Sequence, residues 1–205
     1  MRYTTLRVTE AGVVLYDLHV ERLAPEGAAG LAAFARFARE ATPGIYGVAL
    51  AGDELRAGRR SGSQLVEGMP VRLAVSPFAS QRGAFRKPGP PSAYDGVRLP
   101  GVATLLTSSD GSEIFESCVA AVLGWDGTHF VGVPEDRPRV ASVAEAAVRA
   151  TLPFVRAPLR TGDRLPLILL NAVAGPCIVS TGRPPVPADA VMLLSQVLQR
   201  FTRRP

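Results

Sequence analysis

Histidine and cysteine are scarce in this chain of 205 residues. The two cysteines, Cys118 and Cys177, are too few for a disulfide framework and lack the spacing of metal ligands. The two histidines, His19 and His129, are isolated and do not form the pattern of a zinc site. The sequence therefore predicts neither a disulfide-stabilised secreted domain nor a metal centre.

A long apolar run is also missing. The longest apolar stretch, Leu165 to Val179, is interrupted by Asn171 and Pro176. It is shorter than the roughly 20 apolar residues that a membrane-spanning helix needs. Residues 1–5 do not form the apolar core of a secretory signal. We therefore expect a soluble cytoplasmic protein with no membrane partner.

Clustered basic charge is missing as well, although the net charge is +5 and the isoelectric point is near 9.9. The arginines are scattered and are not interleaved with aromatic residues, as they are in many nucleic-acid-binding segments. A basic balance suits a small anionic ligand equally well. We expect such a ligand and no nucleic acid; steeply salt-dependent retention on DNA or RNA would indicate the opposite.

Lysine is nearly absent. Of the 23 basic residues, 22 are arginine, and the one lysine is Lys87. Either Lys87 is a remnant of the drift from lysine to arginine, or arginine cannot replace it. A primary amine can lose its proton and form a Schiff base, whereas a guanidinium stays protonated. Composition alone leaves both interpretations open, but it makes Lys87 the first candidate for a catalytic residue.

Proline and glycine are abundant, with 18 and 20 residues, and they divide the first part of the chain into short elements. Apolar alternation indicates strands, and a period near 3.6 indicates a helix in which Leu31, Phe34 and Phe37 share one face. The predicted elements are strands over 4–8, 13–18 and 70–75, a helix over 25–40, and a hairpin of strands 45–51 and 54–60.

A proline-rich connector over 79–92 follows and carries Lys87. Long loops inside compact proteins are commonly functional, so we place the lobe boundary here. The predicted organisation is an N-terminal α/β lobe over 1–78, the connector, and a larger strand-rich lobe over 93–205, giving an α+β class. The second lobe's predicted strands are 102–107, 113–117, 119–125, 129–133, 154–157, 167–170 and 177–180, and its helices are 142–151 and 188–201.

Several residues outside the connector could carry chemistry. Arg22, in His19-Val20-Glu21-Arg22-Leu23, has the planar donor fork that suits a phosphate. Glu116 interrupts an apolar region, and Ser142 opens a helix whose free N–H groups could bind an anion. The small residues after Asn171 would let a ligand approach the backbone closely. Each signal alone is equally compatible with an ordinary surface residue, helix cap or turn.

The order of these residues resembles the class IV, or fold-type IV, family of pyridoxal 5′-phosphate (PLP) enzymes. That family includes branched-chain and D-amino acid aminotransferases and aminodeoxychorismate lyase. His19 to Leu23 looks like the family's His-x-x-Arg-Leu, and Lys87 with Tyr94-Asp95 looks like its Lys…Tyr-Asp segment. The stretch from Ser109 to Ser117 is similar to its acidic-Gly turn followed by Glu-x-Ser. The resemblance runs from about Thr4 to about Val186.

The resemblance implies a two-lobed fold, PLP as cofactor and a homodimer. By position it implies that Lys87 forms a Schiff base with PLP and then moves the substrate's Cα proton. Arg22 would bind the phosphate together with backbone N–H groups of Val143 and Ala144. Glu116 would contact the pyridine nitrogen, and the loop of Asn171 and Ala172 would lie near the phosphate.

Three hypotheses about function follow from these patterns. The short chain and the Asn171-Ala172 loop favour 4-amino-4-deoxychorismate lyase, which releases pyruvate and 4-aminobenzoate. An amino acid aminotransferase of the same family is the alternative, since both would take a small anionic amino-acid-like substrate. Ser142-Val143-Ala144-Glu145 stands where the family has Gly-Ile-Thr-Arg. A non-catalytic binding protein that keeps the fold is therefore a third hypothesis, from another functional class.

Overall fold

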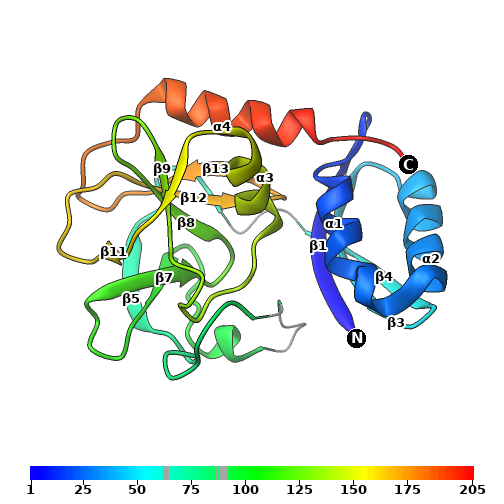
Figure 1. Cartoon of the computed structure of the whole chain (residues 1–205), viewed down its shortest axis with the longest axis horizontal. Helices are drawn as coiled ribbons and strands as arrows, with labels where there is room; N and C mark the ends of the chain where they lie inside the picture. Colours follow the sequence, from blue (N-terminus) through cyan, green and yellow to red (C-terminus); the bar gives the residue numbers. More distant parts are fainter. Residues whose placement is uncertain (62–64, 86, 88–91) are drawn as a thin grey trace.

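The first lobe is a four-stranded antiparallel sheet with two helices packed on one face (Figure 1). In this computed structural model the described residues are 1–61, 65–85, 87 and 92–205. The strand order is β2-β1-β3-β4, and the elements are β1 (Arg2–Thr9), β2 (Gly12–Val13), α1 (Tyr16–Leu23), α2 (Gly27–Glu40), β3 (Gly44–Ala51) and β4 (Glu54–Arg60), with a 3-10 turn over Ala24–Glu26.

Alternation along β1 decides which side chains face the helices. Leu6 and Val8 are buried against Phe34 of α2, together with Val48 of β3. Neighbouring side chains on a strand point to opposite faces, so Tyr3 and Thr5 lie on the other face of the sheet. That face turns toward the second lobe, and this placement becomes important at the functional site.

Helix α1 corrects the predicted strand over 13–18. The strand β2 ends at Val13, Leu15 adopts a left-handed conformation with φ of 58°, and a helix begins at Tyr16. The buried residues of α1 are Tyr16, His19 and Leu23, a spacing of three and four that marks one helix face. The largely apolar residues Val13 to Leu18 resemble a strand in the sequence. The helical period is hidden because the buried position that follows Tyr16 on this helix face is occupied by a histidine, His19.

The second lobe has three layers. Helices α3 (Val143–Thr151) and α4 (Ala188–Arg200) cover one face of a five-stranded sheet of order β10-β9-β8-β12-β13. A second sheet of order β11-β7-β6-β5 packs on the other face. The strands are β5 (Val71–Val75), β6 (Ala103–Thr107), β7 (Glu113–Ser117), β8 (Ala121–Trp125), β9 (Phe130–Gly132), β10 (Phe154–Arg156), β11 (Leu159–Arg160), β12 (Leu167–Asn171) and β13 (Gly175–Ile178).

Strand β12 shows why this lobe has a continuous apolar sequence at its centre. Ile168 and Leu170 pack against the helices, whereas Leu167 and Leu169 pack toward the other sheet. A strand buried on both faces has no polar alternation, which accounts for the unbroken run Leu167 to Leu170.

The division between the lobes differs from the predicted one. Strand β5 was assigned to the lobe over 1–78, but it pairs in parallel with β6, with Val71 opposite Ala103. Leu65 and Met69 also belong to the core of the second lobe. The sheet of the first lobe ends at Arg60. Of the predicted connector, residues 86 and 88–91 lie outside the described part of the chain.

The end of the chain returns to the first lobe. Helix α4 runs over the second lobe in Figure 1, and the residues after it reach β2. There Val13 and Arg203 exchange two backbone hydrogen bonds of 2.9 and 3.2 Å. Gly12 has a φ of 121°, and a Cβ on it would lie 2.3 Å from the carbonyl carbon of Arg203. Contact between the tail and β2 therefore requires glycine at position 12.

No helix in the described part of the chain combines the length and apolar character needed to cross a membrane.

Candidate active site

A cavity of about 440 Å³ is lined by both lobes. Its volume is within the range of about 300–1,000 Å³ typical of small-molecule sites. The first lobe contributes Tyr3, Thr5, Arg22 and Arg60. The remaining groups that matter for chemistry are Lys87, Tyr94, Glu116, Val140, Ser142, Val143, Asn171, Ala172 and Val173.

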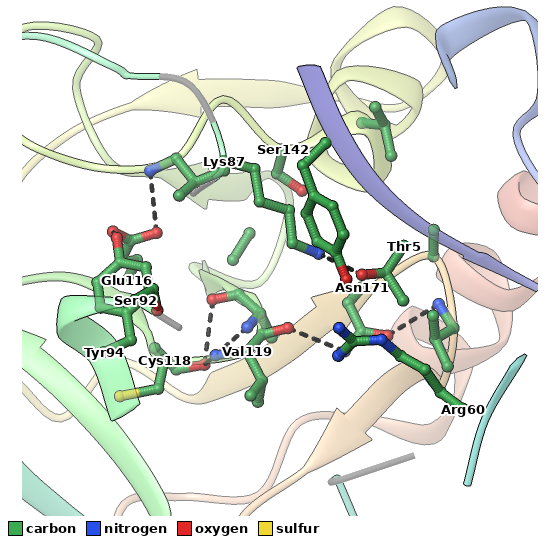
Figure 2. A pocket seen from close by; sticks show the side chains of 18 of the residues that line it. Thr5, Arg60, Lys87, Ser92, Tyr94, Glu116, Cys118, Val119, Ser142 and Asn171 are labelled. Atoms are coloured by element: carbon green, nitrogen blue, oxygen red, sulfur yellow. Dashed lines mark hydrogen bonds between the residues drawn. The ribbon is translucent and has the colours of Figure 1, made fainter. Parts of the chain in front are cut away.

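The Lys87 amine lies against the first lobe's sheet. Nζ donates a hydrogen bond of 3.0 Å to Thr5 Oγ1 on β1 and lies 5.8 Å from the centre of the Tyr3 ring. Figure 2 shows this contact, with Glu116 and Tyr94 seen on the other side of the cavity from Arg60. The amine therefore contacts one wall of the cavity and faces a carboxylate across it.

The surroundings of Lys87 lower its pKa to about 7. Burial of the amine is the largest cause, followed by the positive charges of Arg22 and Arg60, and Glu116 opposes them weakly. At neutral pH a large fraction of the amine is therefore unprotonated. An amine in that form can act as a nucleophile, which an ordinary surface lysine cannot do efficiently.

Glu116 is a buried carboxylate at the end of β7, with 4% of its surface exposed. Its Oε1 accepts a short hydrogen bond from the Tyr94 hydroxyl, and its Oε2 accepts one of 2.9 Å from the backbone N–H of Val140. Burial raises the pKa of Glu116 to about 7, while these two hydrogen bonds and the charge of Arg139 act in the opposite direction. Glu116 is thus held in one orientation by two donors.

Arg22 lies in the last turn of helix α1, and its guanidinium is directed at the start of α3. Nη2 donates to the carbonyl of Ala141, one residue before the N-cap of that helix. Burial, with the charge of Arg2, lowers the pKa of Arg22 to about 10. His19, three residues earlier, has a pKa of about 3 because it is buried and close to Arg22 and Lys87. His19 is therefore neutral, and Arg22 retains its charge at neutral pH.

The segment 139–142 connects these groups. The backbone of Phe85, two residues before Lys87, donates to Arg139 O at 2.8 Å and accepts from Ala141 N at 3.2 Å. Val140 then donates to Glu116, and Ala141 accepts from Arg22. Four consecutive residues thereby fix the lysine segment, the carboxylate and the phosphate-binding candidate relative to one another.

Ser142 is the N-cap of helix α3, as predicted. Ser142 Oγ accepts from the backbone N–H of Glu145 at 3.3 Å. The Glu145 carboxylate does not return to the cap; it pairs with Arg139 at 3.0 Å and Arg156 at 2.7 Å. The first-turn N–H groups of Val143 and Ala144 are available at the start of the helix, as they are in α-helices generally. Val143 lines the cavity, whereas the Ala144 side chain is packed in the core.

The Asn171 side chain organises the loop after β12. Oδ1 accepts from the backbone N–H groups of Val173 and Ala174 at 2.9 and 2.7 Å. Nδ2 donates to the carbonyl of Val119 at 3.1 Å. The amide is therefore committed to holding two loops together, and Ala172 and Val173 form the small-residue surface facing the cavity.

The structure thus brings Arg22, Lys87, Glu116, Val143, Asn171 and Ala172 to one cavity, although they are spread over most of the sequence. The sequence analysis did not select Tyr3, Thr5 or Arg60, which line the same cavity. Tertiary strand pairing places them there, so no local motif marks them. The one available signal was Gly47, a glycine in the middle of a strand.

A second cavity of about 420 Å³ adjoins the first. It shares Tyr3, Arg22, Lys87, Ser142 and Val143 with the first cavity, but Glu116 lines only the first of these two. Lys87 and Arg22 thus line both cavities.

Solved structures with a related fold were found, but no protein-family model and no curated protein matches the sequence. A hypothetical aminotransferase from Mycobacterium tuberculosis in its apo form superposes with a TM-score of 0.67 at 14% identity, covering 98% of this chain and 88% of that one. The same aminotransferase is also known in a PLP-bound form, which superposes with a TM-score of 0.62.

Lyases appear among the similar structures too. The 4-amino-4-deoxychorismate lyase of Pseudomonas aeruginosa superposes with a TM-score of 0.61 at 14% identity, covering 97% of this chain and 90% of that one. A fold IV transaminase from Curtobacterium pusillum gives 0.62 at 17% identity, covering 97% and 84%. Across nearly its full length the chain has the α+β fold of the fold-type IV aminotransferases and aminodeoxychorismate lyases.

Proposed function

We propose that this protein is a PLP-dependent enzyme of class IV and that its activity is 4-amino-4-deoxychorismate lyase. The observation that carries the proposal is the position of Lys87. The chain's one lysine lies in the cavity with a pKa of about 7 and faces a doubly hydrogen-bonded carboxylate. Groups with strongly perturbed pKa values in a cavity are typical of active sites.

The residues of the cavity suit PLP chemically. Arg22 and the first turn of α3 come together through Ala141 and give a cationic side chain and free N–H groups for a phosphate. Glu116 supplies a carboxylate for a pyridine nitrogen, and Lys87 supplies the amine for a covalent bond. When bound, PLP would supply an electron sink that stabilises negative charge at the substrate's Cα.

The protein's own groups have separable roles in this proposal. Arg22, with the N–H groups of Val143 and Ala144, binds the phosphate. Glu116 keeps the ring nitrogen protonated, and Tyr94 and Val140 hold Glu116 in place. Lys87 Nζ first holds the cofactor and then accepts the proton from the substrate's Cα and returns a proton to the reacting carbon. Thr5 Oγ1 orients that amine.

An aminotransferase of the same fold is the second candidate. The Mycobacterium tuberculosis aminotransferase superposes with a higher TM-score than the Pseudomonas aeruginosa lyase does, 0.67 against 0.61. The two activities share the cofactor site and differ in the fate of the substrate's carbon skeleton. We propose a small amino-acid-like anion as the substrate class and a homodimer as the functional form.

One assay separates the candidates. The PLP-loaded protein is given 4-amino-4-deoxychorismate, and 4-aminobenzoate and pyruvate are quantified by chromatography. Equal amounts of both products, lost with Lys87→Ala, support the lyase. Amino transfer from amino acids to 2-oxoglutarate without aminobenzoate release supports the aminotransferase. The absence of both activities would favour a non-catalytic binding protein.

A further inference from the structure

Helix α1 has little in its own sequence to fix where it begins. It is eight residues long, and its N-cap residue is Leu15, whose side chain cannot cap the first turn. A helix this short is marginal by itself and takes its position from tertiary contacts. Leu15 also has a left-handed conformation, which costs a non-glycine residue free energy and persists only where the surroundings hold it.

The second lobe holds this junction between β2 and α1. Val14 and Leu15 are buried in the core cluster that contains Val148 of α3 and Leu194 of α4. Leu18 of α1 packs against the same cluster. The start of α1 is therefore seated in part on the second lobe, although β2 before it pairs in the sheet of the first lobe.

The tail, meaning the residues after α4, contacts the same junction (Figure 1). Besides its backbone pairing with β2, Arg203 forms an ion pair with Asp17 in the first turn of α1, and its Cζ atom lies 5.2 Å from the centre of the Tyr16 ring. Arg204 Nη2 donates a hydrogen bond of 2.9 Å to the carbonyl of Glu10 in the turn before β2. Main-chain and side-chain contacts of the tail thus converge on the start of one helix.

The other end of α1 carries Arg22. Eight helical residues span only about 12 Å, so the tail and the Arg22 side chain contact the two ends of one short rigid element. Arg22 donates to the carbonyl of Ala141 just before α3, where the N–H groups proposed for the phosphate begin. A shift at the start of the helix would therefore be transmitted to the Arg22 guanidinium.

Resting on the proposed function, we infer that Arg203 is a positioning residue, which through α1 holds Arg22 at the site of the cofactor's phosphate. Arg203 lies outside the lining of the two cavities and therefore acts at a distance. The tail is thus a strap between the lobes. Detaching it should weaken binding of the phosphate and leave binding of the pyridine ring unchanged.

The test compares PLP with pyridoxal, which lacks the phosphate, in fluorescence titrations of the full chain. Arg203→Ala should raise the Kd for PLP about 3- to 10-fold, since an exposed ion pair and a cation–π contact each contribute a factor of up to about five. The Kd for pyridoxal should not change. Arg203→Lys keeps the charge opposite Asp17 and should recover most of the affinity. Arg200→Ala, an exposed substitution on α4, is the matched control and should behave as the wild type.

Two double variants test whether Arg203 acts through Arg22 and through the position of the tail. In the Arg22→Gln background, Arg203→Ala should have no additional effect on PLP, because the side chain on which it acts is gone. Val13→Cys/Arg203→Cys joins two opposed residues that exchange backbone hydrogen bonds. The Cα atoms of such a pair are about 5.5 Å apart, within reach of a disulfide. The reduced form should bind PLP as Arg203→Ala does, and the oxidised form as the wild type does.

The contrary outcomes separate this role from the proposed function. If Arg203→Ala weakens PLP and pyridoxal equally, or weakens neither, the positioning role is wrong and the proposed function is unaffected. Additive losses in Arg22→Gln/Arg203→Ala, or equal PLP affinity of the oxidised and reduced disulfide variant, would overturn it in the same way. If the wild type binds PLP no more tightly than pyridoxal, the phosphate site is wrong. The proposed function then fails, and the role of Arg203 fails with it.

Discussion

The backbone N–H of Val140 donates to Glu116 Oε2 at 2.9 Å, and the carbonyl of the next residue, Ala141, accepts from Arg22. Two neighbouring residues therefore contact the carboxylate and the arginine proposed for opposite ends of the cofactor. The same segment pairs with Phe85 near Lys87. We therefore expect the conformation of this segment to affect the relative positions of Glu116, Arg22 and Lys87 more than any single side chain on the cavity wall does.

The buried ion pair of Arg139 and Glu145 connects the start of this segment to helix α3, and 4% and 3% of the surfaces of these two residues are exposed. Glu145→Leu should destabilise the fold by about 3–5 kcal/mol, since it leaves Arg139 buried without its carboxylate. The double variant Arg139→Met/Glu145→Leu should recover most of this loss, as measured by urea unfolding. A single variant as stable as the wild type would show that the pair is not structural.

Lys87→Met should stabilise the protein without PLP at neutral and acidic pH. The folded pKa of about 7 lies below the ordinary value of 10.5. The unfolded chain thus binds more protons between these values, and wild-type stability falls as pH drops from 10.5 to 7. Urea unfolding should show the gain of Lys87→Met in full below pH 7 and its disappearance near pH 10.5. A gain independent of pH would contradict the lowered pKa.

Glu116→Gln should show the opposite pH dependence. The folded pKa of Glu116, about 7, lies above its ordinary 4.5, so the wild type loses stability as pH rises from 4.5 through 7. The stability advantage of the variant should appear over that range and stay constant above it. Activity of the PLP-loaded variant should fall about 100-fold through loss of the charge. Unchanged activity would remove Glu116 from the proposed mechanism.

Arg22→Gln should weaken binding of PLP about 10- to 100-fold, because a charge-assisted hydrogen bond to phosphate is lost. Pyridoxal, which lacks the phosphate, is the matched ligand and should bind both proteins equally. Fluorescence titration of each ligand gives the two dissociation constants. Equal weakening of both ligands would mean that Arg22 acts only through its contact with Ala141.

Leu167 to Leu170 and the Ser142 cap are local patterns, and both appear in the structure as predicted. The sequence predicts these elements of the second lobe better than it predicts helix α1 of the first lobe or the boundary between the lobes. Helix α1 was not predicted because the turn before it depends on Leu15 in a left-handed conformation. A glycine at that position would have indicated such a turn, but the residue is a leucine. The boundary at residue 78 was misplaced because the parallel pairing of β5 with β6 is a tertiary contact.

The residues of the candidate site likewise fall into two groups, those that the sequence could identify and those that only the structure places in the cavity. Lys87, Arg22 and Glu116 have residue types that suggest chemistry on their own, and their order along the chain could be compared with a known family. Tyr3 and Arg60 are ordinary residues on separate strands. Only the register of β1, β3 and β4 places them over Gly47 and beside the amine.

The most direct measurement of the central claim is the visible spectrum of the protein with PLP, before and after borohydride, followed by peptide mapping. We predict a yellow absorption band that borohydride removes, with the reduced cofactor found on Lys87 and neither feature in Lys87→Ala. A wild-type protein without the band, or a Lys87→Ala variant that still carries reduced cofactor away from the N-terminal amine, would contradict the account.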